Sequence, residues 1–116
     1  MKYVCLVYLV ESDMNAMSKR EADACTEESL SYDEALRRSG HLIASQALQP
    51  VEAATTIRVR NGKLSTTDGP FAETKEQLGG FILIEARDLN DAIQVAAKIP
   101  MGRRGTIEVR PIKELK

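Results

Sequence analysis

Residues 3–10 (YVCLVYLV) form an apolar run without alternation, and this run constrains the fold more than any other feature of the chain. A strand with one solvent-exposed face alternates apolar and polar side chains, whereas an unbroken apolar run is typical of a strand covered on both faces. We therefore expect a central strand here. Residues 79–87 (GGFILIEAR) are also apolar on both faces until Glu85, and we expect another strand there.

Two segments carry the signals of helices. Ser18 begins a Ser-Lys-Arg-Glu capping box, and apolar or small residues then recur at steps of three and four as far as Leu36. Asp88 predicts the start of a second helix of about ten residues, which Pro100 ends. Residues 11–17, between the first strand and the first helix, are polar, and we expect a loop there.

An Asn-Gly dipeptide at positions 61–62 predicts a tight hairpin, because both residues tolerate the positive φ angles of a two-residue turn. The preceding residues 55–60 (TTIRVR) alternate between apolar and charged side chains. With the turn at 61–62, Val59 stands opposite Leu64, so the pairing keeps apolar side chains on one face. We therefore expect a hairpin with one apolar face.

The order of the expected elements defines the fold class. Further strands are expected at 41–48 and 106–112, so the chain reads strand, helix, strand, hairpin, strand, helix, strand. Without the added β-hairpin, this order is the βαββαβ unit of a ferredoxin-like α+β fold, with two helices on one face of an antiparallel sheet. The 116 residues suffice for one domain and leave nothing to cover the other face. We expect a homodimer packed sheet to sheet.

Charge and composition exclude several classes of function. The net charge is −1, so no overall field attracts nucleic acid or a membrane surface. The longest apolar run is too short to span a bilayer, and we expect no signal peptide because no cleavage site follows it. Cys5 and Cys25 form neither a zinc motif nor a disulfide framework, and we expect buried, reduced thiols in a cytoplasmic protein. We expect no cofactor and no metal ion.

Residues 68–81 (DGPFAETKEQLGGF) place four charged side chains and a Gly-Pro pair between two expected strands, where a tight turn would suffice. We expect one or two helical turns in this loop, entered through its Asp-Gly-Pro start. Long ordered loops often carry function, and in that interpretation Asp68, Glu73 and Lys75 border a cleft that binds a small polar ligand. Phe71 would be a pocket wall or a core anchor. The alternative is a capped loop with solvated charges.

The same segment carries a family resemblance. Together with MKYVCLVYLV at 1–10, GHLIASQALQP at 40–50 and IEVRPI at 107–112, it resembles the YCII-related family, specifically the DGPF-domain branch, often called DGPFAETKE proteins. The resemblance covers nearly all of residues 1–116. It implies a dimeric α/β barrel in which each half is ferredoxin-like. The family is largely bacterial, and some relatives are encoded beside extracytoplasmic-function sigma factors.

A few YCII-like relatives are enzymes that act on chlorinated ring compounds, and a helix His and an Asp are proposed as their catalytic pair. The only histidine here is His41, which lies at an expected strand start, so that pair does not transfer to matching positions. An unperturbed imidazole titrates near neutral pH, which suits a general base. We take His41 as a candidate catalytic residue and Asp68 as the residue that would orient it. The alternative is a hydrogen-bonded or exposed His at a strand edge.

The sequence is compatible with two functions. The first is binding or catalysis of a small molecule in a cleft bordered by the loop around Phe71. The second is a non-catalytic interaction or regulatory module linked to an extracytoplasmic-function sigma factor, which the family resemblance alone implies. The chain shows no complete catalytic constellation, so its sequence is compatible with both an enzyme and a non-catalytic protein.

Overall fold

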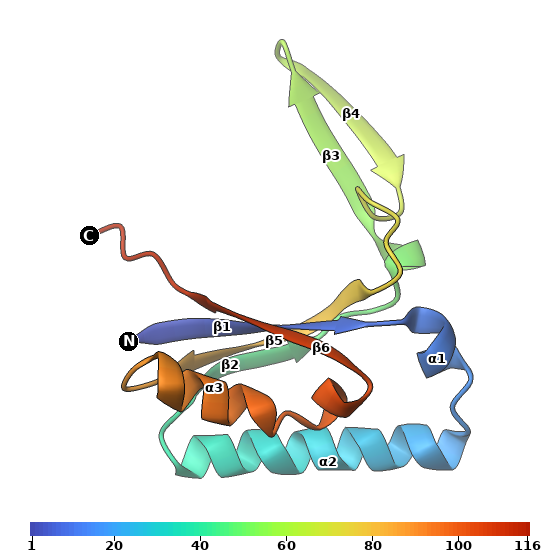
Figure 1. Cartoon of the computed structure of the whole chain (residues 1–116). Coiled ribbons are helices and arrows are strands. Elements are labelled where there is room, and N and C mark those ends of the chain that lie inside the picture. Colours follow the sequence, from blue (N-terminus) through green and yellow to red (C-terminus); the bar gives the residue numbers. More distant parts are fainter.

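In a computed structural model that describes residues 1–116, a four-stranded antiparallel sheet forms the centre of the molecule (Figure 1). The strand order is β2-β5-β1-β6, so β1 is a central strand, as the sequence predicted, and β5 is the other central strand. The architecture is mixed α+β and is compatible with a ferredoxin-like fold. The four strands are β1 (Lys2–Leu9), β2 (Leu42–Ala47), β5 (Gln77–Glu85) and β6 (Gly105–Pro111).

Both longer helices cover the same face of this sheet (Figure 1). Helix α2 (Lys19–Arg38) begins after Ser18, whose hydroxyl accepts from the Glu21 amide while the Glu21 carboxylate accepts from the Ser18 amide. Helix α3 (Leu89–Ala97) begins after Asp88, whose side chain accepts a backbone hydrogen bond from the third helical residue. Both predicted helix starts are confirmed. No helix is both long enough and apolar enough to cross a membrane.

Three short helical segments lie outside the two longer helices. They are α1 (Glu11–Asn15) and two 3₁₀ turns, η1 (Val51–Ala53) and η2 (Pro100–Arg103). The sequence predicted a loop over residues 11–17, and this was wrong for α1. Glu11 and Asp13 lie in the first turn of α1, where the positive end of the helix dipole stabilises acidic side chains.

The core lies between the sheet and the two longer helices. Tyr3, Cys5 and Val7 of β1 point toward the helices together with Ile82 and Ile84 of β5, and all five are buried. The alternate side chains of the same strands point to the opposite face, which no helix covers (Figure 1). This uncovered face carries apolar side chains that are only half-buried: Val4, Leu6, Tyr8 and Leu83.

Strands β3 (Thr55–Arg60) and β4 (Lys63–Asp68) form a separate two-stranded sheet that projects from the uncovered side (Figure 1). The register places Val59 opposite Leu64, as the Asn-Gly turn predicted. The projection makes the molecule extended. Its radius of gyration is 16.0 Å, whereas a compact chain of this length would have a radius of about 13 Å.

Residues 69–76, between β4 and β5, contain no helix, so the predicted helical turns are wrong. The side-chain amide of Gln77 donates to the carbonyl oxygens of Ala72 at 3.1 Å and of Thr74 at 3.2 Å, and the Thr74 hydroxyl donates to the Glu76 carbonyl at 2.7 Å. Side chains thus occupy carbonyl groups that a helix would reserve for its own amides. The result is an irregular loop on the uncovered side of the sheet.

Candidate binding site

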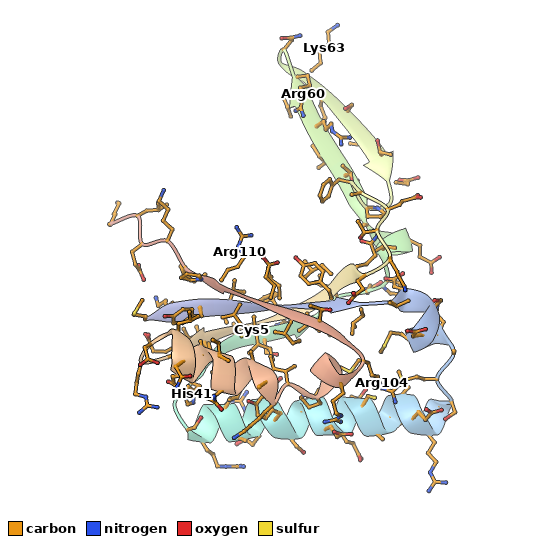
Figure 2. The ribbon with its side chains drawn as sticks, viewed as in Figure 1. Cys5, His41, Arg60, Lys63, Arg104 and Arg110 are labelled. Atoms are coloured by element: carbon orange, nitrogen blue, oxygen red, sulfur yellow. The ribbon has the colours of Figure 1, made fainter.

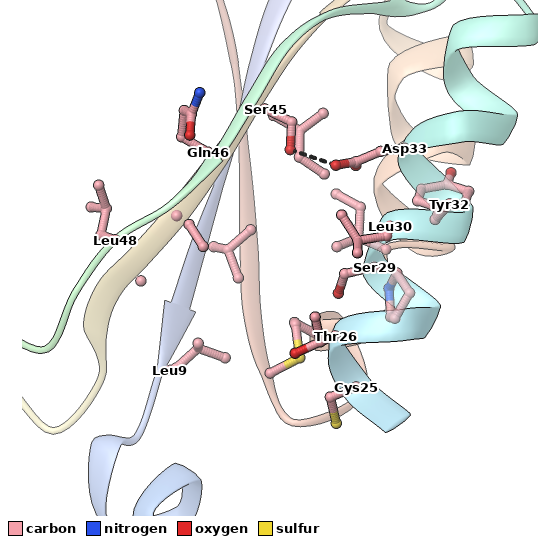
Figure 3. A pocket seen from close by; sticks show the side chains of 18 of the residues that line it. Leu9, Cys25, Thr26, Ser29, Leu30, Tyr32, Asp33, Ser45, Gln46 and Leu48 are labelled. Carbon is pink, nitrogen blue, oxygen red and sulfur yellow. Dashed lines mark hydrogen bonds between the residues drawn. The ribbon is translucent and has the colours of Figure 1, made fainter. Parts of the chain in front are cut away.

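A cavity of about 510 Å³ lies between α2 and the sheet (Figure 3). Its walls come from β1, β2 and β5 on one side, from α2 on the other, and from α1 and η2 at the ends. Ligand-binding pockets in proteins have volumes of about 300–1,000 Å³ and are mostly apolar. Of the 22 residues that line this cavity, 14 are hydrophobic, so it has both the size and the character of a small-molecule site.

Sulfur atoms form part of the apolar wall. Met14, Met17 and Met101 line the cavity, and the thiol of Cys25 lies 3.9 Å from the sulfur of Met17. Methionine side chains are flexible and polarizable, so such a wall can adapt to ligands of different shape. The sequence predicted two buried thiols, and this holds for Cys5, which has no exposed surface. Cys25 is instead half-buried and faces the cavity.

A polar pair lies inside this apolar cavity (Figure 3). Ser45 on β2 donates a hydrogen bond to Oδ2 of Asp33 on α2, with 3.0 Å between the oxygens. Asp33 is the only charged side chain among the residues that line the cavity, and it takes part in none of the ion pairs of the chain. Since a carboxylate has about four acceptor positions, Asp33 retains capacity to bind a ligand donor.

Glycine shapes the sheet wall of the cavity. Gly80 on β5 lies so close to β2 that a Cβ atom would be 2.8 Å from the backbone oxygen of Gln46. Any larger residue would therefore push β2 away from β5. The paired glycines at 79–80, which the sequence placed at the start of this strand, allow the close approach.

The structure places His41 outside this cavity, in a network with Ser39 and Asp91. Its Nε2 lies 3.2 Å from both carboxylate oxygens of Asp91, and its Nδ1 lies 2.7 Å from the hydroxyl of Ser39. Asp91 is only 8% exposed. The amide of Arg87 donates to its carboxylate at 3.0 Å and is the main reason that the pKa of Asp91 is lowered, with a smaller contribution from the His41 hydrogen bond.

The network is satisfied whether the imidazole is neutral or charged. The Ser39 hydroxyl lies within hydrogen-bond distance of the Leu36 carbonyl at 3.1 Å and of His41 Nδ1, so its proton can be donated to either. In both states the Nε2 proton of His41 points to Asp91. Both ring nitrogens therefore have partners within the chain. His41 acts in this structure as a tie between the end of α2 and the start of α3.

The structure does not bring Asp68 to His41. The two lie at opposite ends of β2, because the His41 carbonyl accepts from Glu85 at one end of β5 while the Leu48 amide donates to Gly79 at the other. Asp68 lies beyond that second end, at the base of the hairpin, where it pairs with Thr55. The six residues of β2 alone span roughly 20 Å.

The other predicted site residues, Phe71, Glu73 and Lys75, are not among the residues that line the cavity. They belong to the irregular loop on the uncovered side of the sheet (Figure 1), and Phe71 is 80% exposed. The predicted border of the cleft is therefore not formed by this loop within one chain. No group of three or more His, Cys, Asp or Glu side chains is arranged to hold a metal ion.

Sequence reasoning missed Asp33 and Ser45, although α2 carried a usable signal. Thr26, Ser29 and Asp33 recur at steps of three and four, directly beside the apolar stripe of the helix. A polar row in that position faces the edge of the core rather than solvent. The position of Ser45 opposite this row depends on the packing of β2 against α2, which no local pattern encodes.

The fold and the site define the class of protein. It is a small α+β protein whose sheet is covered on one face and which has a ligand-sized cavity under its longest helix. The chain belongs to the YCII-related family, because the model of the YCII-related domain matches residues 1–116. It is also 37% identical over 114 residues to a protein of Rhizobium meliloti (strain 1021) that is described as uncharacterised. That match covers 97% of this chain and 92% of the relative.

Proposed function

We propose that the protein binds a small, mostly apolar molecule with a cationic or hydrogen-bond-donating end in the cavity between α2 and the sheet. The observation that carries this proposal is the Asp33–Ser45 pair, which lies among mostly apolar walls. Apolar walls favour the burial of hydrocarbon, at about 25 cal/mol for each Å² removed from water. The polar pair then fixes the orientation of the molecule.

Charge selects between ligand classes. A ligand carboxylate would place a second negative charge beside Asp33 in a partly dry cavity, where neither charge would find a compensating cation among the lining residues. An ammonium group would instead pair with Asp33 through a charge-assisted hydrogen bond. An amine is therefore the preferred class, followed by a neutral alcohol, with a carboxylic acid last.

The chemistry available at the cavity also bears on catalysis. If the bound molecule is converted, Asp33 is the acid–base group within reach, because it is the only charged side chain on the cavity wall. His41 is held by Asp91 and Ser39 outside the cavity. We therefore assign His41 to stability and propose binding, rather than a particular reaction, as the function.

A thermal-shift comparison tests this proposal. Phenylbutylamine, phenylbutanol and phenylbutyric acid share one hydrocarbon skeleton and differ only in the end group. We expect the amine to raise the melting temperature most and the acid least, because a ligand that binds the native state stabilises it. Asp33→Asn should abolish the preference for the amine. Asp23→Asn is the matched control, since Asp23 lies on the same helix but pairs with Lys19 at the surface.

The proposal fails if the acid stabilises the protein as well as the amine does, or if Asp33→Asn leaves the preference intact. The competing function, a regulatory module that associates with an extracytoplasmic-function sigma factor, predicts no shift with any of the three probes and a stable complex with such a factor. We also propose, on the DGPFAETKE segment at 68–76, that the chain falls in the DGPF branch of its family and acts in the cytoplasm.

A further inference from the structure

The cavity wall that α2 contributes carries a second polar group, the hydroxyl of Ser29. Ser29 is half-buried and lines the cavity one helical turn before Asp33. Figure 3 shows both side chains directed from α2 toward the sheet. Residues four positions apart lie on the same face of a helix, and they are about 6 Å apart along its axis. Ser29 and Asp33 therefore form two polar points on a wall that is mostly apolar.

The Ser29 hydroxyl has no hydrogen-bond partner within the chain. A hydroxyl inside a helix commonly donates to the backbone carbonyl one turn before it. Thr26 follows this pattern, because its hydroxyl donates to the Ala22 carbonyl at 3.1 Å. Ser29 makes no such bond and no bond to another side chain. Both its donor and its acceptor positions are thus free to meet a bound molecule.

This free hydroxyl limits which molecules suit the cavity. A plain hydrocarbon chain that crossed Ser29 would remove its hydroxyl from water and offer no hydrogen bond in return, which is unfavourable. A hydroxyl on the ligand would replace the lost water, since a hydroxyl both donates and accepts. The position therefore favours a second polar group on the ligand, one helical turn away from the group that Asp33 binds.

The sulfur atoms define the other end of the ligand. Cys25 lies one further turn before Ser29 on α2, and its thiol is 3.9 Å from the sulfur of Met17. Sulfur atoms make favourable contacts with aromatic rings. Figure 2 shows His41 beside the C-terminal end of α2, beyond Asp33 and away from this sulfur-lined end. From its C-terminal end, α2 thus presents a carboxylate, a hydroxyl and a thiol in that order.

We propose that the cavity selects an amino alcohol with an aromatic end. Its amine pairs with Asp33, its hydroxyl bonds to Ser29, and its ring contacts the sulfur atoms of Cys25 and Met17. An extended chain of four carbon atoms between the nitrogen and the oxygen spans about 6 Å, which matches the rise from Ser29 to Asp33. The inference rests on the proposed function, because Asp33 holds the amine in both, and it adds Ser29 as a residue that determines specificity among amines.

Two positional isomers test the role of Ser29. Both 4-amino-1-phenylbutan-1-ol and 1-amino-4-phenylbutan-2-ol are phenylbutylamine with one added hydroxyl. Four carbon atoms separate the nitrogen from the oxygen in the first, so its hydroxyl reaches Ser29, whereas two separate them in the second. We expect isothermal titration calorimetry to give the first isomer a dissociation constant about fivefold lower than the second, because it gains one hydrogen bond.

Ser29→Ala should make the two dissociation constants equal, and the variant should fold because alanine is the residue most favourable to a helix. Ser31→Ala is the matched control, since Ser31 lies on the same helix but is exposed and does not line the cavity. It should preserve the fivefold difference between the isomers.

The outcomes separate this inference from the proposed function. If phenylbutylamine binds through Asp33 but the isomers bind equally to the wild type, or their difference survives Ser29→Ala, the role of Ser29 is wrong and the amine site stands. If none of the three amines binds, or if Asp33→Asn binds them as tightly as the wild type does, the proposed function and this inference are both wrong.

Discussion

The two faces of the central sheet differ in how much of their apolar surface a single chain covers. Ile84 on β5 points toward the helices and has no exposed surface, whereas its neighbour Leu83 points the other way and is only half-buried. Both side chains are equally apolar and lie on the same strand. An apolar side chain on a strand therefore favours burial, but it does not determine which part of the protein buries it. α2 and α3 bury such side chains on one face, and on the other we propose a second copy.

Alanine substitutions at these neighbouring positions should produce the largest contrast. Ile84→Ala should lower the free energy of unfolding by about 2–5 kcal/mol, because it leaves a cavity in a filled core. Leu83→Ala should cost roughly 1 kcal/mol or less, since its side chain is already partly exposed to water. Urea denaturation of the two variants measures both values. Equal losses at the two positions would contradict the contrast between the faces.

A smaller effect should appear in the pH dependence of the free energy of unfolding, through Asp91 on the helix-covered side of the sheet. The lowered pKa of Asp91 means that its carboxylate is better stabilised in the folded chain than in the unfolded one. Its contribution is therefore fully present above the ordinary Asp pKa of about 3.9 and is lost as the pH falls through the lower folded value. Asp91→Asn should reduce the urea midpoint at neutral pH.

The difference between wild type and Asp91→Asn should shrink as the solution is acidified below that range. Asp23→Asn serves again as the control, because its partner Lys19 is highly exposed and surface pairs of this kind contribute little. If the gap between wild type and Asp91→Asn stayed constant down to strongly acidic pH, the network of His41, Ser39 and Asp91 would not have the assigned role.

The smallest expected effect concerns the reactivity of the two thiols on the helix-covered side of the sheet. Burial raises the pKa of Cys5 to about 11, so its reactive thiolate is scarce at mildly alkaline pH. Cys25 is half-buried and lines the cavity. Brief treatment with iodoacetamide followed by peptide mass spectrometry should find Cys25 modified and Cys5 intact, and phenylbutylamine should slow the reaction at Cys25. Equal modification of both thiols in the native protein would contradict the assigned burial.

The sequence predicted most of what depends on neighbouring residues. The capping box at Ser18, the cap at Asp88 and the turn at 61–62 each act within a few residues, so their signals survive without knowledge of the fold. The unbroken apolar run at residues 3–10 likewise identified β1 as a central strand, because such a run is typical of a strand that is covered on both faces.

The candidate site depended on contacts between distant residues, and there the sequence was a poor guide. Asp33 meets Ser45 only because α2 packs across β2, and His41 meets Asp91, fifty positions away, only because α3 returns to the same end of the sheet. Asp68 was chosen as the partner of His41 on chemistry alone. The loop around Phe71 attracted attention through its charge and length, but neither property encodes the face of the sheet on which it lies.

Chemical-shift mapping with phenylbutylamine tests most directly the central claim that the helix-covered face holds the binding site. In nitrogen–proton spectra of the labelled protein, we predict that the largest changes fall on the amides of Ser29, Asp33 and Ser45 and their cavity neighbours. Changes concentrated on the β3–β4 hairpin at residues 55–68, or no changes at saturating amine, would contradict it.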